Sequence, residues 1–203
     1  KNRFGAINEL GIFAMTDQGM REVPNPSAIF LQRGDLDTAG SVATVTWEGT
    51  RSLLVEIQAL VDESPSGHPR RIAVGLDQQR LSMQLAIMHR HCAISLGDQD
   101  VFVNVVGGIK IQETGSDLAL VLAALSSFKN RSLPRDLIVF GEIGLTGELR
   151  PVVNGQERLR EAAKHGFRKA IVPFANQPKE PIAGLVVHAA KQLSSALEAL
   201  EAL

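Results

Sequence analysis

Ser116 occupies a position typical of a catalytic nucleophile. It stands in the segment ETGSDLA, residues 113–119, where a predicted strand passes into a predicted helix. There a serine hydroxyl and the first amides of the helix converge on one point, as nucleophilic catalysis requires. The segment also suits helix capping, because Thr114 and Asp117 stand three apart as in a capping box. Thr114, Ser116 and Asp117 either form a reactive site or satisfy the amides at the helix end, and capping is the simpler interpretation.

A nucleophilic serine needs a base, and the helix predicted over residues 155–166 is the segment able to supply one. Gln156 lies in its first turn, and a glutamine side chain does not accept a proton at neutral pH. Arg158 and Arg160 stay protonated, and Lys164 is expected at the exposed surface. Without an amine of lowered pKa the Ser116 hydroxyl is a poor nucleophile.

The first five residues, KNRFG, place two cations close together. Lys1 and Arg3, separated by Asn2, would point to the same side of an extended segment. Phe4 could anchor that segment in a core, and Gly5 permits a turn. Such an arm suits contact with phosphate groups, and it also suits an ordinary solvated loop.

Further cations occur along the rest of the chain. Arg80 and Arg90 fall on one predicted helix, Lys110 follows Gly107–Gly108 near the end of a predicted strand, and Lys129 and Arg131 lie in a loop beyond the next helix. Each cluster alone is typical of a solvated surface. Several clusters on one face, or repeated around a ring, would bind a phosphate backbone, and the sequence does not reveal whether they converge.

The composition of the 203 residues excludes several classes of protein. A net charge of −1 and a pI near 6.6 exclude a chain that is basic all over, so nucleic-acid contact requires a local patch. The single cysteine, Cys92, rules out an internal disulfide, which fits a cytoplasmic protein. No apolar run reaches about 18 residues, so no membrane span is expected. The sequence lacks a Walker motif, GxxxxGKS/T, and its histidines lack metal-site spacing, so we expect no bound nucleotide and no metal.

The hydrophobic spacing predicts an α/β or α+β domain with a mixed sheet and packed helices. Residues 8–23 indicate two strands around a turn at Asp17–Gly19, and residues 24–40 form a connector. Strands are expected at 41–49, 51–61, 71–76, 100–111, 169–174 and 184–190, and a strand, turn and strand at 136–152 with the turn at Thr146–Gly147. Gly107–Gly108 would mark a bulge or a close backbone approach within the strand 100–111. Helices are expected at 77–93, 116–130, 155–166 and 192–200, the first with Asp77 as its N-cap.

Several segments together resemble RadA/Sms, a family of bacterial recombination ATPases. KNRFG, followed by NELGIFAMTDQGMREVPNPS, is similar to the family's junction segment, of which KNRFG is the signature. GLDQQRLSMQLAIMHRH, DVFVNVVGGIKIQETGSDLALVLAALSS, GEIGLTGELRPV and QERLREAAKHGFRKAIVP resemble its carboxy-terminal domain. That domain is related to the proteolytic domain of Lon protease, and the resemblance covers essentially the whole chain.

The resemblance implies that residues 1–35 end a RecA-like ATPase core and that residues 36–203 form a domain with the Lon-protease-like fold. It implies a longer parent protein with a zinc finger and a core that uses ATP and Mg²⁺, whereas no cofactor is expected within this sequence. The parent would assemble into hexameric rings, act with a recombinase in DNA repair, and drive branch migration. The Lon-like domain would supply ring contacts and bind duplex DNA, with Lys1 and Arg3 near nucleotide or DNA at a subunit boundary. The candidate DNA-binding residues are Arg80, Arg90, Lys110, Lys129 and Arg131.

The sequence also differs from Lon proteases at a position that Lon uses for catalysis. Lon proteases use a Ser–Lys dyad, and here Ser116 falls at the serine's position while the lysine's position falls on Gln156. The resemblance therefore implies a non-proteolytic domain with no catalytic residue. Two alternatives remain, namely an active Ser–Lys-type peptidase that uses Ser116 with another base, and a purely structural ring former without DNA contact.

Overall fold

The computed structural model describes residues 13–23, 38–49, 51–65 and 67–203. The KNRFG segment and the predicted boundary between residues 35 and 36 lie outside these described residues, and both stay predictions. β1 (Phe13–Thr16) and β2 (Gly19–Glu22) pair as an antiparallel hairpin. This confirms the pair of strands expected around the turn at residues 17–19.

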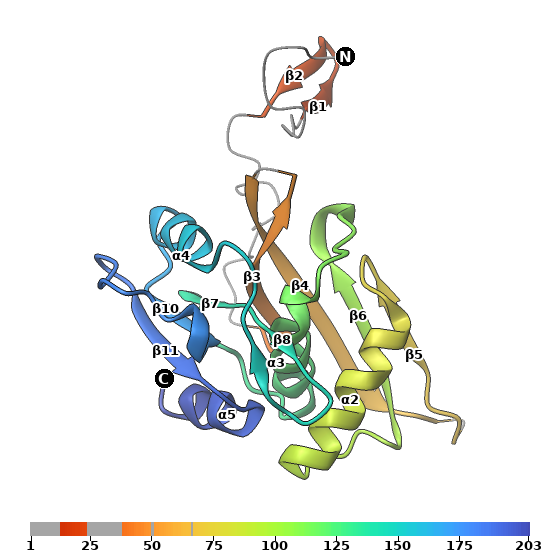
Figure 1. Cartoon of the computed structure of the whole chain (residues 1–203). Helices are drawn as coiled ribbons and strands as arrows, with labels where there is room; N and C mark the ends of the chain where they lie inside the picture. Colours follow the sequence, from red (N-terminus) through yellow and green to blue (C-terminus); the bar gives the residue numbers. More distant parts are fainter. Residues whose placement is uncertain (1–12, 24–37, 50, 66) are drawn as a thin grey trace.

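Within the described residues from Ser41 onward, the chain builds a seven-stranded mixed sheet (Figure 1). Its strands are β3 (Ser41–Glu48), β4 (Arg51–Glu63), β5 (Arg71–Val74), β6 (Gln99–Val105), β7 (Leu137–Val139), β10 (Lys169–Pro173) and β11 (Val186–Ala190). They lie in the order β11-β10-β7-β3-β4-β6-β5. The central pairs β3–β4 and β4–β6 are antiparallel, and the outer pairs are parallel. The predicted α/β class with a mixed sheet is confirmed.

The helices cover both faces of this sheet because residues alternate between its faces along each central strand. α2 (Gln78–Cys92), α3 (Asp117–Phe128) and α5 (Leu193–Glu201) share a core cluster with Leu53 and Val55 of β4. α4 (Gly155–Lys164) shares a second cluster with Leu54, the residue between them. The site described below lies where the first residues of α3 meet segments from both layers.

α2 begins as predicted. The Asp77 side chain accepts a hydrogen bond from the Arg80 amide at 2.8 Å, and Leu81, Leu85 and Met88 are buried. This cap satisfies an amide that otherwise has no partner in the first helical turn, and the buried stripe fixes the face that α2 turns to the sheet. Arg80 is thereby directed toward the start of α3.

The strand predicted over residues 100–111 is shorter than expected. β6 ends at Val105, and η1 (Val106–Gly108) follows, with φ of 85° at Gly107 and 72° at Gly108. These left-handed conformations suit glycine, and a Cβ at Gly108 would meet no atom within 4 Å, so a turn and not a close approach explains that glycine. After the turn, the Ile111 amide donates to the Gly75 carbonyl at 2.8 Å, which leads the chain past the end of β5 toward α3.

A small hairpin closes the far side of the site. β8 (Glu142–Ile143) and β9 (Leu149–Arg150) pair antiparallel around a turn in which Gly147 has φ of 81°. A Cβ at Gly147 would lie 2.9 Å from the His91 ring of α2, so this turn also requires glycine for space. The predicted turn and the strands on either side of it are confirmed, but the first strand is divided into β7 of the main sheet and β8 of the hairpin. None of the described helices is long and apolar enough to cross a membrane.

Candidate functional site

Ser116 ends η2 (Thr114–Ser116) immediately before α3, and its side chain is buried. It borders a pocket of about 620 Å³ between the end of β5, residues 110–113 and the start of α3. The pocket is lined by Ala73, Val74, Gly75, Leu76, Asp77, Arg80, Lys110, Ile111, Gln112, Glu113, Ser116, Asp117 and Leu120. Its volume is within the range of small-ligand sites.

The capping interpretation of residues 114–117 is wrong. Ser116 occupies the N-cap position of α3, but its side chain makes no capping hydrogen bond. The Thr114 hydroxyl donates to Glu142 of β8, and the Asp117 carboxylate is engaged by other elements. Thr114 and Asp117 therefore join the start of α3 to its neighbours instead of satisfying its first amides.

Asp117 connects the start of α3 to α2 and β8. Arg80 donates from Nε and Nη2 to the two oxygens of the Asp117 carboxylate, and the Ile143 amide donates to Oδ2 at 3.0 Å. Burial raises the pKa of the Asp117 carboxyl group, against the opposing effect of these donors. The hydrogen bond from Arg80 to Asp117 in turn raises the pKa of the guanidinium above its ordinary value. This bidentate pair fixes one wall of the Ser116 pocket.

A second guanidinium–carboxylate pair forms on the other side of Ser116. Arg158 of α4 is fully buried and donates to Glu113 from Nη1 at 2.7 Å and from Nη2 at 2.6 Å. It also donates to the Val45 carbonyl at 2.5 Å and to the Val153 carbonyl at 2.9 Å. The Trp47 amide donates to the same carboxylate at 3.0 Å. Arg158 thus ties β3, α4 and the segment before α3 together.

Sequence reasoning treated Arg158 only as a protonated side chain and missed that it is buried. The signal was present, because residue 158 stands four positions before the inward-facing Ala162 and next to the buried Leu159. A cation on the apolar stripe of an amphipathic helix requires a carboxylate partner within reach. The sequence could not identify that partner as Glu113, which is 45 residues away.

The two positions predicted for a Ser–Lys dyad, Ser116 and Gln156, lie at the start of α3 and in the first turn of α4. Gln156 is half-buried on α4 and is not among the residues that line the Ser116 pocket. The lysine that does line this pocket is Lys110, which is exposed and follows the glycine turn. Chemically, the pocket lining offers the Ser116 hydroxyl, the Gln112 amide, the Arg80 guanidinium, the Lys110 amine and three carboxylates. Of the carboxylates, Glu113 and Asp117 are bound by arginines and Asp77 caps α2.

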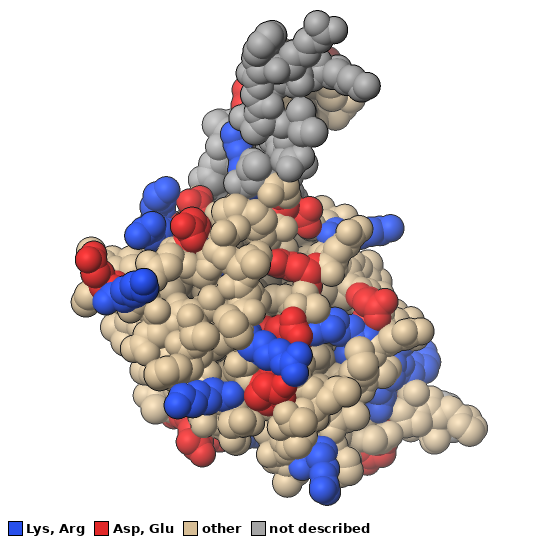
Figure 2. All heavy atoms as spheres, in the orientation of Figure 1, with Lys and Arg blue, Asp and Glu red and all other residues tan. Residues whose placement is uncertain are grey.

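The other candidate DNA-binding residues, Arg90, Lys129 and Arg131, do not line the Ser116 pocket. Arg90 is exposed near the C-terminal end of α2, whereas Lys129 and Arg131 follow α3 and border a separate cavity. Figure 2 shows that, on the displayed face, lysines and arginines of the described residues stand among carboxylates. Arg150, for example, lies 2.6 Å from Glu148 and 3.8 Å from Glu142. These neighbours limit the positive potential of that face.

The hairpin carboxylate Glu148 is held ionised by its surroundings. A hydrogen bond from Thr146, followed in effect by one from the backbone amide of Glu148 and then by one from Arg150, lowers the pKa of the Glu148 carboxyl group from 4.5 to about 2. Within the described residues, no group of three or more His, Cys, Asp or Glu side chains is arranged to hold a metal ion.

The chain matches one family model and several proteins that share one name. Residues 66–176 match the family model described as subunit ChlI of Mg-chelatase. The chain is 63% identical over 201 residues to a protein of Haemophilus influenzae named DNA repair protein RadA. Proteins of the same name from Bacillus subtilis and Aquifex aeolicus are 46% and 41% identical over 177 and 200 residues. These three matches cover 99%, 87% and 98% of this chain but 44%, 38% and 44% of the relatives, so the chain spans less than half of their length.

Proposed function

This chain belongs to the RadA/Sms family of DNA repair proteins, within the domain family described as subunit ChlI of Mg-chelatase, and on that premise we propose that it is a non-proteolytic module that binds duplex DNA and joins subunits into a ring. The ring would be hexameric and would serve branch migration. The likeness of its sequence to the proteolytic domain of Lon supports a scaffold that has kept the domain without its peptidase chemistry.

The observation that carries the non-proteolytic part is the identity of the cation that α4 directs inward. The position that the resemblance gives to the lysine of a Ser–Lys dyad is Gln156 here, so α4 supplies no amine there. The cation that α4 does direct inward is Arg158, an arginine, which does not act as a base and is already held by Glu113 and the Val45 carbonyl. The Ser116 pocket is therefore left without a general base from α4.

Arg90 and Lys110 are the exposed cations that we assign to the DNA backbone. Neither forms an ion pair with another residue of the described part of the chain. A chain of net charge −1 attracts DNA weakly, but a ring multiplies such contacts because each subunit adds its own to one duplex. Arg80 forms a bidentate ion pair with Asp117, and we assign it to positioning the start of α3 instead of to DNA contact. Lys1 and Arg3 would act near nucleotide or DNA at a subunit boundary.

We expect the double variant Arg90→Ala, Lys110→Ala to bind duplex DNA more weakly, irrespective of its sequence. Loss of two phosphate contacts should reduce the slope of log K against log salt by about 2 for each bound subunit. Band shifts over a salt series measure this slope, with light scattering on the same samples to establish assembly.

Lys179→Ala is the matched control, because Lys179 is exposed and lies outside the proposed surface. It should leave the slope unchanged. If the assembled wild-type chain does not retard duplex DNA, or if its binding does not depend on salt, the module is a ring former without DNA contact.

By the same resemblance, we assign ATP hydrolysis with Mg²⁺ to the RecA-like core of the longer parent and the zinc site to its finger. A recombinase would be a partner of that parent. These activities concern parts of the relatives beyond the 44% of their length that this chain spans.

One observation favours a peptidase as the second candidate, namely that Lys110 borders the same pocket as Ser116. Lys110 is exposed and follows the glycine turn instead of lying on α4, so we expect no turnover of unfolded casein by the assembled chain. Cleavage measured by fluorescence of labelled casein tests this. Turnover that disappears in both Ser116→Ala and Lys110→Ala, but persists in Lys179→Ala, would replace the scaffold proposal with a Ser–Lys peptidase.

A further inference from the structure

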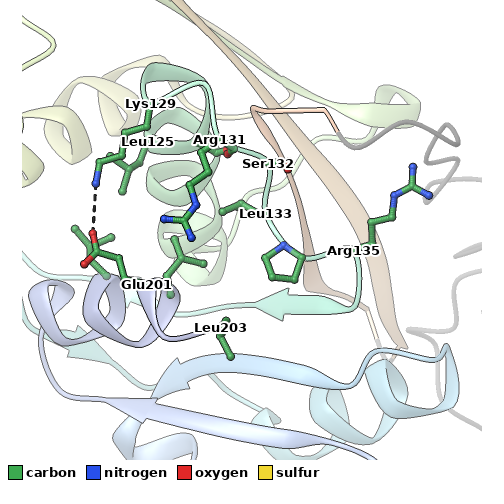
Figure 3. A pocket seen from close by; sticks show the side chains of 12 residues that line it. Leu125, Lys129, Arg131, Ser132, Leu133, Arg135, Glu201 and Leu203 are labelled. Carbon is green, nitrogen blue, oxygen red and sulfur yellow. Dashed lines mark hydrogen bonds and ion pairs between the residues drawn. The ribbon is translucent and has the colours of Figure 1, made fainter.

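A second cavity, distinct from the Ser116 pocket, opens between the end of α3, residues 129–135 and α5 (Figure 3). Its volume is about 440 Å³. The walls are mainly aliphatic and include Leu125, Leu133, Leu197, Leu200 and Leu203. Leu125 is buried and the other leucines are half-buried, so the cavity leaves apolar surface partly open to water.

The loop that forms one wall is held in place before any ligand arrives. The Ser126 hydroxyl donates to the Arg131 carbonyl at 2.6 Å, and the Arg131 amide donates to the Ser126 carbonyl at 3.0 Å. The same hydroxyl accepts from the Gly40 amide at 2.8 Å, which ties the loop to the start of β3. A ligand therefore orders little of the protein when it binds, which lowers the entropic cost of association.

Cations stand around this apolar surface. Arg131 is exposed, extends over the cavity in Figure 3, and forms no ion pair within the described part of the chain. Lys129 lies 3.5 Å from Glu201, and both side chains are exposed, so this pair is weak and can exchange for another carboxylate. The cavity thus presents positive charge beside a leucine-lined floor.

This combination favours a peptide over a nucleic acid. The lining residues include no aromatic side chain on which a base could stack. A phosphate backbone would satisfy Arg131 and Lys129 but leave the leucine walls facing water. A peptide with aliphatic anchors and flanking carboxylates would satisfy both the walls and the cations.

We propose that this cavity is a docking site for an acidic, leucine-bearing peptide segment of a partner protein. Leucine side chains of the segment enter between α3 and α5, and its carboxylates pair with Arg131 and Lys129. Leucines three and four positions apart would allow the segment to bind as a helix in the groove. This role is separate from DNA binding by Arg90 and Lys110.

The test uses the whole 203-residue chain and a short fluorescein-labelled helical peptide of glutamates with leucines three and four positions apart. Fluorescence anisotropy measures binding, and methyl NMR of the leucines locates it. We expect saturable binding, shifts at Leu133, Leu197 and Leu200, and about tenfold or more weaker affinity for Arg131→Glu. Lys179→Glu makes the same change of charge elsewhere and should bind like the wild type.

Two further probes separate the alternatives. A peptide with serine in place of leucine should not bind, because the carboxylates alone do not use the apolar walls. The proposal is overturned if the leucine peptide fails to bind at low salt, if methyl shifts fall outside the cavity, or if Arg131→Glu binds it as tightly as Lys179→Glu. It is also overturned if Arg131→Glu loses duplex DNA while its affinity for the peptide is unchanged, since Arg131 then serves a phosphate backbone.

Discussion

Replacing Arg158 with methionine should lower the free energy of unfolding by about 3–5 kcal/mol. Methionine fills part of the space but removes the guanidinium donors from the Val45 carbonyl and from the Glu113 carboxylate, which keeps only the Trp47 amide. A charge left unpaired in a mostly buried setting costs more than the pair contributes when intact. Urea unfolding followed by fluorescence of Trp47 measures the change, and Trp47 is the single tryptophan.

The matched control is Arg160→Met, an exposed arginine two residues along the same helix, which should change stability by less than about 0.5 kcal/mol. If Arg158→Met does not fold, Arg158→Lys tests the same contact with a smaller expected loss of stability. Its single ammonium keeps the charge but replaces a guanidinium that donates to both Glu113 oxygens. Equal losses for Arg158→Met and Arg160→Met would show that the buried pair does not hold α4 to β3.

Replacing Asp117 with alanine should cost about 3 kcal/mol. The change strips the Ile143 amide of its acceptor and Arg80 of its bidentate partner. Asp117→Asn should cost less, because its amide oxygen can still accept from Ile143 while the charge is lost. Urea unfolding gives the loss of stability, and amide hydrogen exchange at Ile143 should accelerate in the alanine variant.

Asp98→Ala, which removes an exposed aspartate, serves as the comparison and should stay within about 0.5 kcal/mol of the wild type. An additional Arg80→Ala substitution completes a double-mutant cycle, in which the two changes should cost less together than the sum of their separate costs. Additive losses, with unchanged exchange at Ile143, would mean that Asp117 does not join α3 to α2 and β8.

Features that depend on neighbours in the sequence could be predicted. Asp77 caps α2, and a cap needs only the amide three residues ahead. Leu53 and Val55 of β4 face one core and Leu54 faces the other, because side chains alternate along a strand. The sequence predicts that Gly107–Gly108 interrupt the strand, but not that the strand ends in a turn there, because glycine suits both a left-handed turn and a bulge.

The ion pairs around the Ser116 pocket could not be predicted from the sequence. Arg80 and Asp117 are 37 residues apart, and Arg158 and Glu113 are 45 apart, so no local pattern pairs them. The segment ETGSDLA has the pattern of a cap because Thr114, Ser116 and Asp117 are all capping residues. Thr114 and Asp117 instead bond to neighbouring elements that only folding brings near, and Ser116 makes no capping bond.

Local patterns were enough to predict most of the strands and helices, the family and the lack of a lysine at the position of Gln156. The burial of Arg158, the place of Lys110 beside the Ser116 pocket and the apolar cavity between Lys129 and Arg131 emerge only in the folded chain. The difference arises because secondary structure follows from short-range sterics and periodicity. Burial and charge pairing instead depend on which distant segments share a small volume.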